Sequence, residues 1–125
     1  MLPISRFMAR EPYSVKSTDN LERARTLMDR HSIRHLPVID GDKLLGILLG
    51  RDLAILESIP GMKPAHVEVA RVMVPALSVP DTMPIDDALE LMTKQRADCV
   101  VVRDNVGVIG IFTSTDAVIA VAAAG

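Results

Sequence analysis

The chain has 125 residues and a formal net charge of −2, a length that suits one compact module with a hydrophobic core and is too short for two independent domains. Apolar residues make up 49% and charged residues 24%, a balance typical of a folded protein, and no apolar run is long enough to span a membrane. The start of the sequence also lacks the apolar stretch of a signal peptide, so we expect a cytoplasmic protein that does not bind a membrane. Basic residues are scattered among acidic ones and aromatic residues make up only 2%, so nucleic acid is not an expected partner.

The most informative feature of the sequence is an internal repeat. The segment Ser14–Ala54 aligns without a gap with Ser78–Val118. The lead-ins Ile4–Met8 and Val69–Met73 also match after a shift of one residue. The identical pairs are Ser14/Ser78, Val15/Val79, Thr18/Thr82, Ala24/Ala88, Leu27/Leu91, Met28/Met92, Val38/Val102, Asp40/Asp104, Gly46/Gly110, Ile47/Ile111 and Asp52/Asp116. This match predicts two copies of one structural unit in tandem.

The repeat divides the chain into a first copy over 1–60, a linker over 61–68 and a second copy over 69–125. A proline stands at each end of Pro60–Pro64, which is typical of a linker between structural units. Half of the chain is too small to bury a sufficient core alone. We therefore expect the two copies to form one intertwined globular module.

Each copy is predicted to contain a core-facing first helix after a short strand. Apolar residues recur at steps of three and four, which places them on one helical face. These residues are Leu21, Ala24, Leu27 and Met28 in the first copy and Ile85, Ala88, Leu91 and Met92 in the second. A capping box of Asp19 and Glu22 is predicted to start the first of these helices. Thr82, with Pro84 in the first turn, is predicted to start the other.

Two short apolar strands joined by a turn follow, and a second helix closes each copy. The predicted strands are Leu36–Ile39, Leu44–Leu48, Cys99–Val102 and Val108–Phe112, and the predicted second helices are Asp52–Ile59 and Asp116–Ala124. The expected fold class is α/β of the α+β kind. It consists of two β-α-β-β-α repeats packed by pseudo-twofold symmetry, each with a small three-stranded sheet and helices on one side of it.

The second helix of the second copy has almost no polar face. Its run Ala117–Ala124 contains no polar residue. A helix that is apolar all round buries more than one side, and for so small a chain the extra partner is expected to be another molecule of the same protein. We therefore predict a homodimer through the helices, and the sequence leaves open whether its chains run parallel or antiparallel.

The segment Gly110–Asp116, where a buried strand ends and a helix begins, carries the most informative chemistry. Unpaired amides and the positive end of the helix dipole favour an anion such as phosphate at this place. The hydroxyls of Thr113 and Thr115 can add donors, and the Asp116 carboxylate suits the two hydroxyls of a ribose. An equally open interpretation is that Thr113 or Ser114 caps the helix and Asp116 complements its dipole.

The whole pattern resembles the CBS domain, and the tandem pair resembles a Bateman module. The segments that carry the resemblance are the lead-ins ending in Met8 and Met73, His35–Asp40, the strands containing Gly46 and Gly110, and Thr113–Asp116. The resemblance implies a regulatory module that binds AMP, ADP, ATP or S-adenosylmethionine between the copies. It also implies dimers that pack through their helices into a flat disc.

The resemblance implies one strong nucleotide site, centred on Asp116 in the cleft between the copies. Arg34 and His35 are the residues expected to reach the phosphates across that cleft. Arg34 could equally be a solvated charge at a strand entrance. Backbone groups are expected to form hydrogen bonds with the edge of the adenine ring. The residues that would supply these groups are Val79, Pro80, Asp81 and Val100. Val79 and Val100 also have an ordinary interpretation as core residues.

A second, weaker site is expected at the other strand-to-helix junction. Leu49 stands there in place of a hydroxyl residue, and Asp98 and Cys99 are expected to face it, so like charge would repel phosphate. The residues predicted to form this site are Asp52, Arg51, Ser14 and Val15. We expect it to be weak, empty or suited to an adenosyl ligand without phosphates.

No catalytic residues, catalytic cofactor or metal site are predicted. Cys99 is flanked by valines, which is typical of a buried, inert thiol. The three histidines, His31, His35 and His66, have no metal-ligand spacing. The chain is therefore expected to be a stand-alone regulatory pair that binds an adenine nucleotide and signals to a separate effector protein. The alternatives are a dimerising interaction scaffold without a ligand and a sensor of S-adenosylmethionine.

Overall fold

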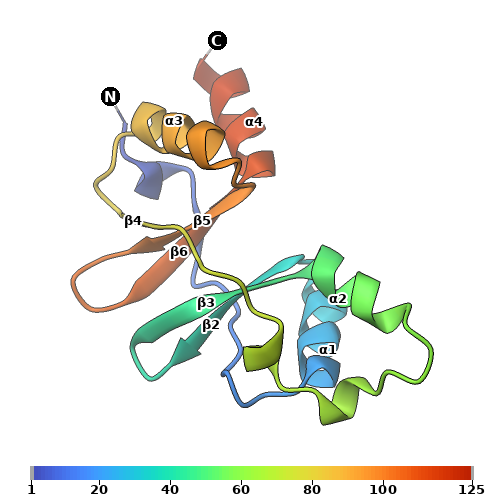
Figure 1. The fold of residues 1–125 in the computed structure, drawn as a ribbon. Coiled ribbons are helices and arrows are strands. Elements are labelled where there is room, and N and C mark those ends of the chain that lie inside the picture. Colours follow the sequence, from blue (N-terminus) through green and yellow to red (C-terminus); the bar gives the residue numbers. More distant parts are fainter. Residues whose placement is uncertain (1, 125) are drawn as a thin grey trace. The chain divides into compact units, whose positions relative to one another are not determined.

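The computed structural model describes residues 2–124, which form two compact units (Figure 1). We call Tyr13–Ala76 the first-repeat unit. The second-repeat unit contains the chain up to Pro12 together with the chain from Leu77 onward. Each lead-in therefore packs with the other copy of the sequence repeat, because Ile4–Met8 lies in the second-repeat unit and Val69–Met73 in the first-repeat unit. No described helix has the length and apolar character needed to cross a membrane.

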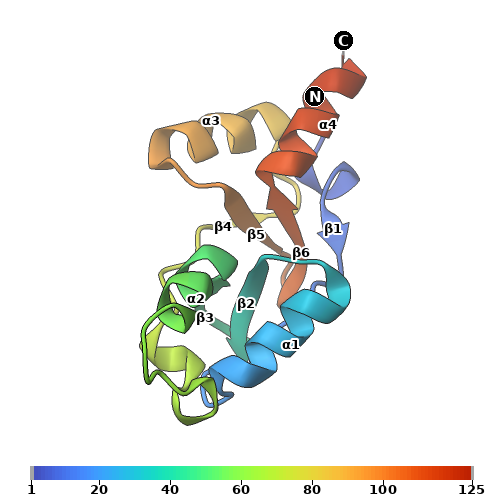
Figure 2. The ribbon, with the colours of Figure 1, turned by 90° about the vertical axis from the view of Figure 1, so that its right-hand side faces the viewer.

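The second-repeat unit is built on a four-stranded sheet with the order β1-β6-β5-β4. Its elements are the 3-10 turn Ile4–Arg6, β1 (Ala9–Arg10), β4 (Ser78–Pro80), α3 (Ile85–Gln95), β5 (Cys99–Arg103), β6 (Val108–Thr113) and α4 (Ser114–Ala124). Strands β5 and β6 form the predicted antiparallel hairpin, β4 pairs with β5 in parallel, and β1 adds an antiparallel edge beside β6 (Figure 2). The two residues that follow the N-terminal lead-in thus supply a fourth strand that the sequence repeat does not predict.

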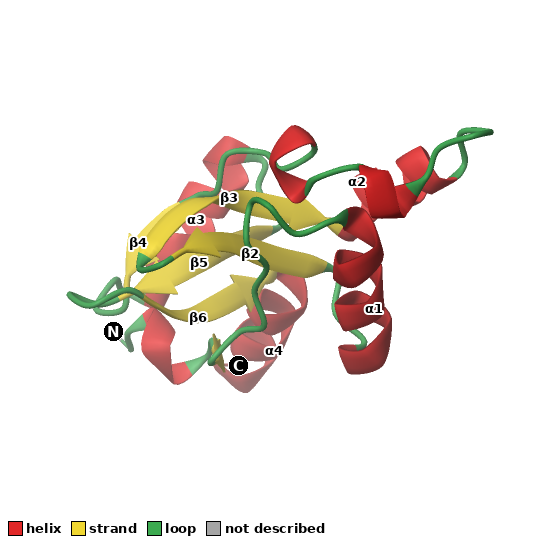
Figure 3. Cartoon of the chain, turned by 90° about the horizontal axis from the view of Figure 1, so that it is seen from below, coloured by secondary structure: helices red, strands yellow, loops and turns green. Residues whose placement is uncertain are grey.

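The first-repeat unit has a two-stranded sheet, and its two α-helices, α1 and α2, are labelled in Figure 3. Its elements are α1 (Leu21–His31), β2 (His35–Asp40), β3 (Lys43–Leu49), α2 (Gly50–Glu57) and the 3-10 turns Pro64–His66 and Val69–Arg71. Strands β2 and β3 form the predicted hairpin. The flanking strands are reduced to single bridges, Val15 with Val38 and Ile47 with Val74. The expected three-stranded sheets are therefore a four-stranded sheet in one unit and a bridged hairpin in the other.

Both helices of each unit pack on one face of its strands, as predicted. Side chains that alternate along the strands point to the helices and form one apolar core in each unit. The second-repeat core contains Val79, Val100, Val102 and Phe112 from strands with Ala88, Met92 and Ala120 from helices. The first-repeat core contains Leu36, Val38 and Leu48 from strands with Leu21, Ala24, Met28 and Leu53 from helices. The α+β fold class follows directly from these two layers.

The predicted starts of the first helices are displaced by one or two residues. Asn20, not Asp19, caps α1, and its side chain accepts a hydrogen bond of 2.9 Å from the backbone N–H of Arg23. Asp19 instead accepts from the N–H of Lys16 in the preceding turn. In the second copy Pro84 is itself the N-cap residue, without a side-chain cap, so it precedes the first turn of α3. Neighbouring Asp and Asn residues compete for the cap, and pattern alone does not decide between them.

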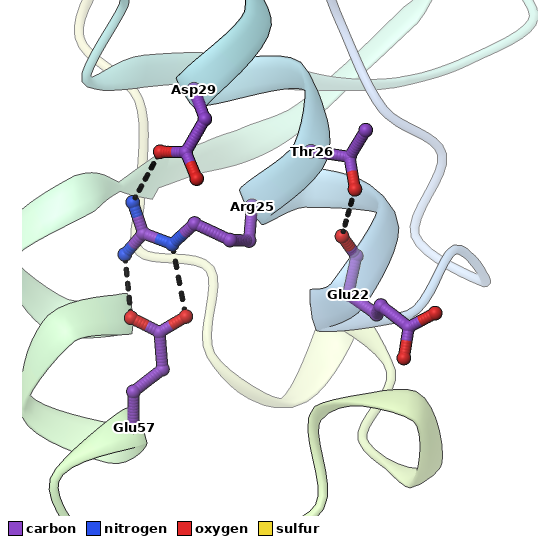
Figure 4. A network of polar contacts seen from close by, with 5 residues as sticks. All are labelled: Glu22, Arg25, Thr26, Asp29 and Glu57. Carbon is purple, nitrogen blue, oxygen red and sulfur yellow. Dashed lines mark hydrogen bonds and ion pairs between the residues drawn. The ribbon is translucent and has the colours of Figure 1, made fainter.

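An ion pair joins the two helices of the first-repeat unit (Figure 4). The Arg25 guanidinium in α1 donates two hydrogen bonds to the Glu57 carboxylate in α2, at 2.9 and 2.6 Å, and a third of 3.3 Å to Asp29. The hydrogen bond with Glu57 is the main cause that raises the pKa of Arg25. The positions aligned with Arg25 and Glu57 in the second copy are Leu89 and Val121, so the second-repeat helices carry apolar side chains where the first-repeat helices carry charges.

Candidate functional site

The junction between β6 and α4 is held by the acidic residue predicted to bind a ligand. The backbone N–H of Thr113 and its hydroxyl both donate to Oδ2 of Asp116, at 2.9 and 3.2 Å. Asp116 therefore accepts through this oxygen from the last residue of β6, which ties the first turn of α4 to the end of the strand. Among residues 2–124 no hydrogen bond reaches the other oxygen, Oδ1, which stays available to an incoming hydroxyl. Fixing one oxygen of a carboxylate orients the second one without further loss of side-chain entropy.

Other polar groups at this junction are accessible. Ser114 and Thr115 are exposed at the start of α4. The Ser114 backbone N–H donates a hydrogen bond of 2.9 Å to the Asp98 carbonyl, which ties the helix start to the residue before β5. The hydroxyls of Ser114 and Thr115 and the positive end of the α4 dipole can therefore act on an anion at this place. The sequence pattern indicates Ser114 only as a possible cap.

The junction between β3 and α2 repeats the backbone arrangement but not the capping. The Gly50 N–H donates 2.8 Å to the Arg34 carbonyl, as Ser114 does to Asp98 in the other unit. Leu49, the N-cap residue of α2, makes no side-chain cap. Within the described residues 2–124, the Asp52 carboxylate has only a loose contact, of 3.9 Å, with the Nε of Arg51. The Asp52 carboxylate thus has weaker contacts within the protein than the Asp116 carboxylate, which accepts two hydrogen bonds.

The residues expected to reach phosphates are divided between the two units. In the first-repeat unit Arg34 directly precedes β2, and His35 is the first residue of β2 and pairs with Leu49 across the hairpin. Thr113, Thr115 and Asp116 lie in the second-repeat unit. Within its own unit Arg34 is therefore adjacent to the Asp52 junction, through the close approach of its backbone to Gly50.

Two of the residues expected to read adenine are core residues by their side chains. Val79 is 1% exposed and Val100 is 0% exposed, and both belong to the apolar core of their unit. The Val101 N–H bonds to the Leu77 carbonyl and the Asp81 N–H to the Arg103 carbonyl, so alternate residues of β4 turn their polar backbone groups toward β5. Val79 lies between Leu77 and Asp81, so its backbone N–H and carbonyl also point toward β5. The Pro80 carbonyl accepts a hydrogen bond of 3.0 Å from the Met83 N–H, so the backbone groups left for a ligand at this sheet edge are those of Ser78. The sequence pattern does not single out Ser78.

At the corresponding edge of the first-repeat unit, the backbone groups of Val15, which aligns with Val79, are likewise used within the sheet. The Val15 N–H donates 3.0 Å to the Pro37 carbonyl, and the Val15 carbonyl accepts 2.9 Å from the Ile39 N–H. The Val15 side chain is 2% exposed. Val15 therefore has neither a backbone group nor a side chain at the surface, whereas its neighbour Ser14 is exposed.

Cys99 is buried, as predicted from the valines around it. Burial, together with the charge of Asp98, raises the pKa of the thiol to about 12. At neutral pH the side chain is a protonated thiol, which is a poor nucleophile.

Comparison with known proteins agrees with the tandem repeat found in the sequence. The model of the family described as CBS domain matches residues 4–57 and again residues 69–123. An inosine-5'-monophosphate dehydrogenase from Thermoplasma acidophilum is 33% identical over 108 residues, which are 86% of this chain and 21% of the dehydrogenase. The chain thus spans about a fifth of that relative's length, and 35% of another relative, the protein MJ1232 of Methanocaldococcus jannaschii.

Two solved structures have the same fold over nearly the whole chain. The CBS domain pair of protein MJ0100, in complex with 5'-methylthioadenosine and S-adenosyl-L-methionine, has a TM-score of 0.87 and 23% identity, and covers 100% of this chain and 99% of its own. CBSX2 in complex with AMP has a TM-score of 0.82 and 25% identity, and covers 98% of each chain. These likenesses agree with the tandem repeat found in the sequence.

Proposed function

The chain belongs to the CBS-domain family and contains two copies of the domain, and we propose that it is a regulatory module that binds an adenine nucleotide at the β6–α4 junction. The observation that carries the proposal is the Asp116 carboxylate, which is fixed through Oδ2 and presents Oδ1 beside the exposed start of α4. The AMP complex of CBSX2, a chain of the same fold, supports this choice of ligand. The chain spans a small part of the dehydrogenases that it matches, and their chemistry is not part of the proposal.

Each part of the junction has a proposed role in holding the nucleotide. Oδ1 of Asp116 accepts from a ribose hydroxyl, a hydrogen bond strengthened by the charge of the carboxylate. The hydroxyls of Ser114 and Thr115 and the α4 dipole favour the phosphate. The edge groups of Ser78, not the buried side chains of the valines, contact the adenine. Arg34 and His35 are proposed to read phosphates.

The first test is calorimetric titration of AMP, ADP, ATP and S-adenosylmethionine into the wild-type protein and Asp116→Ala. A hydrogen bond to a charged group contributes about 1.5 to 3 kcal/mol, so the variant should lose roughly tenfold to a hundredfold in nucleotide affinity. Asp116→Asn keeps an oxygen that can cap α4 and tests the charge in a helix that still starts correctly. The matched control is Asp87→Ala, because Asp87 is an exposed acid in the first turn of α3.

Three outcomes separate the candidate functions. Binding of a nucleotide that is weakened by added salt and by Arg34→Ala supports a phosphate-reading sensor. Binding of S-adenosylmethionine that is insensitive to Arg34→Ala identifies a sensor of that ligand instead. Folded protein that binds none of the four ligands would contradict the sensor proposal and would favour a ligand-free interaction scaffold.

A regulatory role requires a second protein that reads the bound state. A ligand shifts a conformational equilibrium only by its different affinities for the two states, so the effector must bind AMP-loaded and ligand-free protein with different affinities. Affinity capture with and without AMP, followed by identification of the proteins retained, measures this difference. Equal capture in both conditions would contradict the signalling part of the proposal.

A homodimer through the helices is proposed from the exposed apolar residues of α4. Val118 is 69% exposed, Ile119 is 61% exposed and Val121 is 60% exposed, a contiguous apolar surface that a monomer would leave in water. Ile119→Asp is expected to convert the dimer to monomer in sedimentation velocity. Val106→Asp, at a position 82% exposed in the β5–β6 turn, is the matched control and should stay dimeric. A wild-type monomer at micromolar concentration would contradict this proposal.

A further inference from the structure

The second helices of the two units differ in the surface that they leave exposed. Between Asp116 and its last residue, helix α4 contains no polar side chain. Its exposed apolar residues include Val118, Ile119 and Val121, each more than half exposed. The residues of α2 aligned with these three are Ala54, Ile55 and Glu57. The exposed apolar surface thus continues along α4, whereas a charged residue interrupts it in α2.

The charged residue of α2 belongs to the ion pair that joins α1 to α2 (Figure 4). Nη2 of Arg25 and Oε1 of Glu57 lie 2.6 Å apart, and the two side chains are 31% and 29% exposed. A partner that covered this surface would remove the remaining water from both groups. Against an apolar partner, no new hydrogen bond would offset that loss of hydration. An uncharged surface is therefore a poor partner for the first-repeat helices.

The exposed surface of α4 fits a second copy of itself. In a dimer with twofold symmetry, the same surface of both chains lies in the contact. Because α4 has no charged side chain after Asp116, such a contact brings no like charges together in this part of the helix. It also removes large apolar side chains of both chains from water. The chain therefore contains the partner surface that suits α4 best.

We propose that the two chains of the homodimer pack through their second-repeat units, with Val118, Ile119 and Val121 of one chain against the same residues of the other. The Arg25–Glu57 pair disfavours the alternative, in which α4 packs on the first-repeat helices of the other chain. This inference rests on the proposed homodimer. It selects the parallel arrangement, in which like units meet, from the two arrangements that the sequence leaves open.

The net charges of the units act in the opposite direction. The second-repeat unit has more acidic than basic residues, whereas the first-repeat unit is nearly balanced, so long-range attraction favours contact between unlike units. Salt screens exposed charges but does not weaken the burial of apolar surface. Sedimentation velocity should therefore show a dimer that is at least as stable at high ionic strength as at low. A dimer that dissociates as salt is added would overturn the inference.

Charge-reversal variants distinguish the two arrangements, and the positions that they change, Ile119 and Ile55, are 61% and 62% exposed, outside the core. Ile119→Asp and Ile119→Lys should each weaken dimerisation by about tenfold or more, because each places two like charges in the contact. Mixed together they should form a heterodimer, since the new carboxylate then faces the new ammonium group. Native mass spectrometry identifies that heterodimer by its mass. The matched control is Ile119→Asp mixed with Val106→Lys, whose added charge lies in the β5–β6 turn, and it should show no gain in heterodimer.

The double variant Ile55→Lys/Ile119→Asp tests the alternative arrangement directly. It brings opposite charges together only if α4 packs on α2 of the other chain, so it should stay monomeric. Restoration of the dimer in this variant would overturn the inference and leave the homodimer standing. A monomeric wild type would overturn both, and nucleotide binding would be unaffected by that result.

Cysteine cross-linking is a second measurement, and it adds no charge to the contact. Val118→Cys should form a disulfide between two copies of itself on mild oxidation, because the same residues of the two chains meet. A mixture of Val118→Cys and Ala54→Cys, which are exposed and aligned positions, should give no mixed disulfide. The native Cys99 is buried and does not compete. A mixed disulfide as the main product would overturn the inference.

Discussion

Replacing Gly46 with alanine is expected to lower the free energy of unfolding by about 2 to 3 kcal/mol. A Cβ at this position would lie 2.7 Å from the carbonyl oxygen of Val74, a distance that real Cβ atoms do not adopt. That carbonyl cannot move away cheaply, because it accepts a hydrogen bond of 2.9 Å from the Ile47 N–H and the Val74 N–H donates another of 2.9 Å back to Ile47. Chemical denaturation of both proteins measures the difference.

Gly110 is the aligned glycine of the second copy and provides the comparison. A Cβ on Gly110 would lie nearest to the sulfur of Met8, the flexible end of a side chain, with the Ala9 carbonyl oxygen at 3.1 Å. Gly110→Ala should therefore cost less than Gly46→Ala. In double-mutant cycles, Met8→Ala should partly relieve Gly110→Ala, whereas Met73→Ala should not relieve Gly46→Ala, where backbone is the obstacle. A Gly46→Ala protein within about 0.5 kcal/mol of wild type would contradict the close-approach argument.

Local patterns in the sequence are sufficient to predict the elements within each copy. The three- and four-residue spacing of Leu21, Ala24 and Met28 predicts α1, and the same spacing predicts α3. The apolar runs on either side of a short polar turn predict both hairpins. These features depend on contacts between residues close in the chain, which a periodic pattern encodes directly.

Features that depend on distant segments are not predictable from the same patterns. The repeat assigns the lead-in Val69–Met73 to the copy that follows it, yet this segment packs with the copy that precedes it. Because of this exchange, the sequence pattern does not indicate Arg71 as a neighbour of Asp52. No local signal marks such an exchange, because an apolar lead-in matches the core of either copy equally well. The two identical glycines, Gly46 and Gly110, are the available hint, since each leaves room for a crossing lead-in.

Replacing Ile4 with alanine is expected to destabilise the second-repeat unit by about 2 to 4 kcal/mol, although Ile4 lies far from most of that unit in the sequence. Ile4 is 0% exposed and belongs to the same core cluster as Val100 and Phe112. Its N–H donates a hydrogen bond of 2.8 Å to the Met83 carbonyl. Truncation of the Ile4 side chain would leave a cavity, because so small a core has few side chains that could rearrange to fill it.

Hydrogen exchange can show which unit loses stability in this variant, and so tests whether each lead-in packs with the other copy. Ile4→Ala should increase exchange in β5 and β6 first, because those strands line the core that loses its methyl groups. Val69→Ala is the matched variant, since Val69 is also 0% exposed but belongs to the first-repeat core, and it should act first on β2 and β3. Leu2→Ala, at a position 48% exposed, should change neither. If Ile4→Ala increased exchange first in β2 and β3, each lead-in would pack with its own copy. The expected increase in β5 and β6 instead means that each copy depends on a segment of the other for its core.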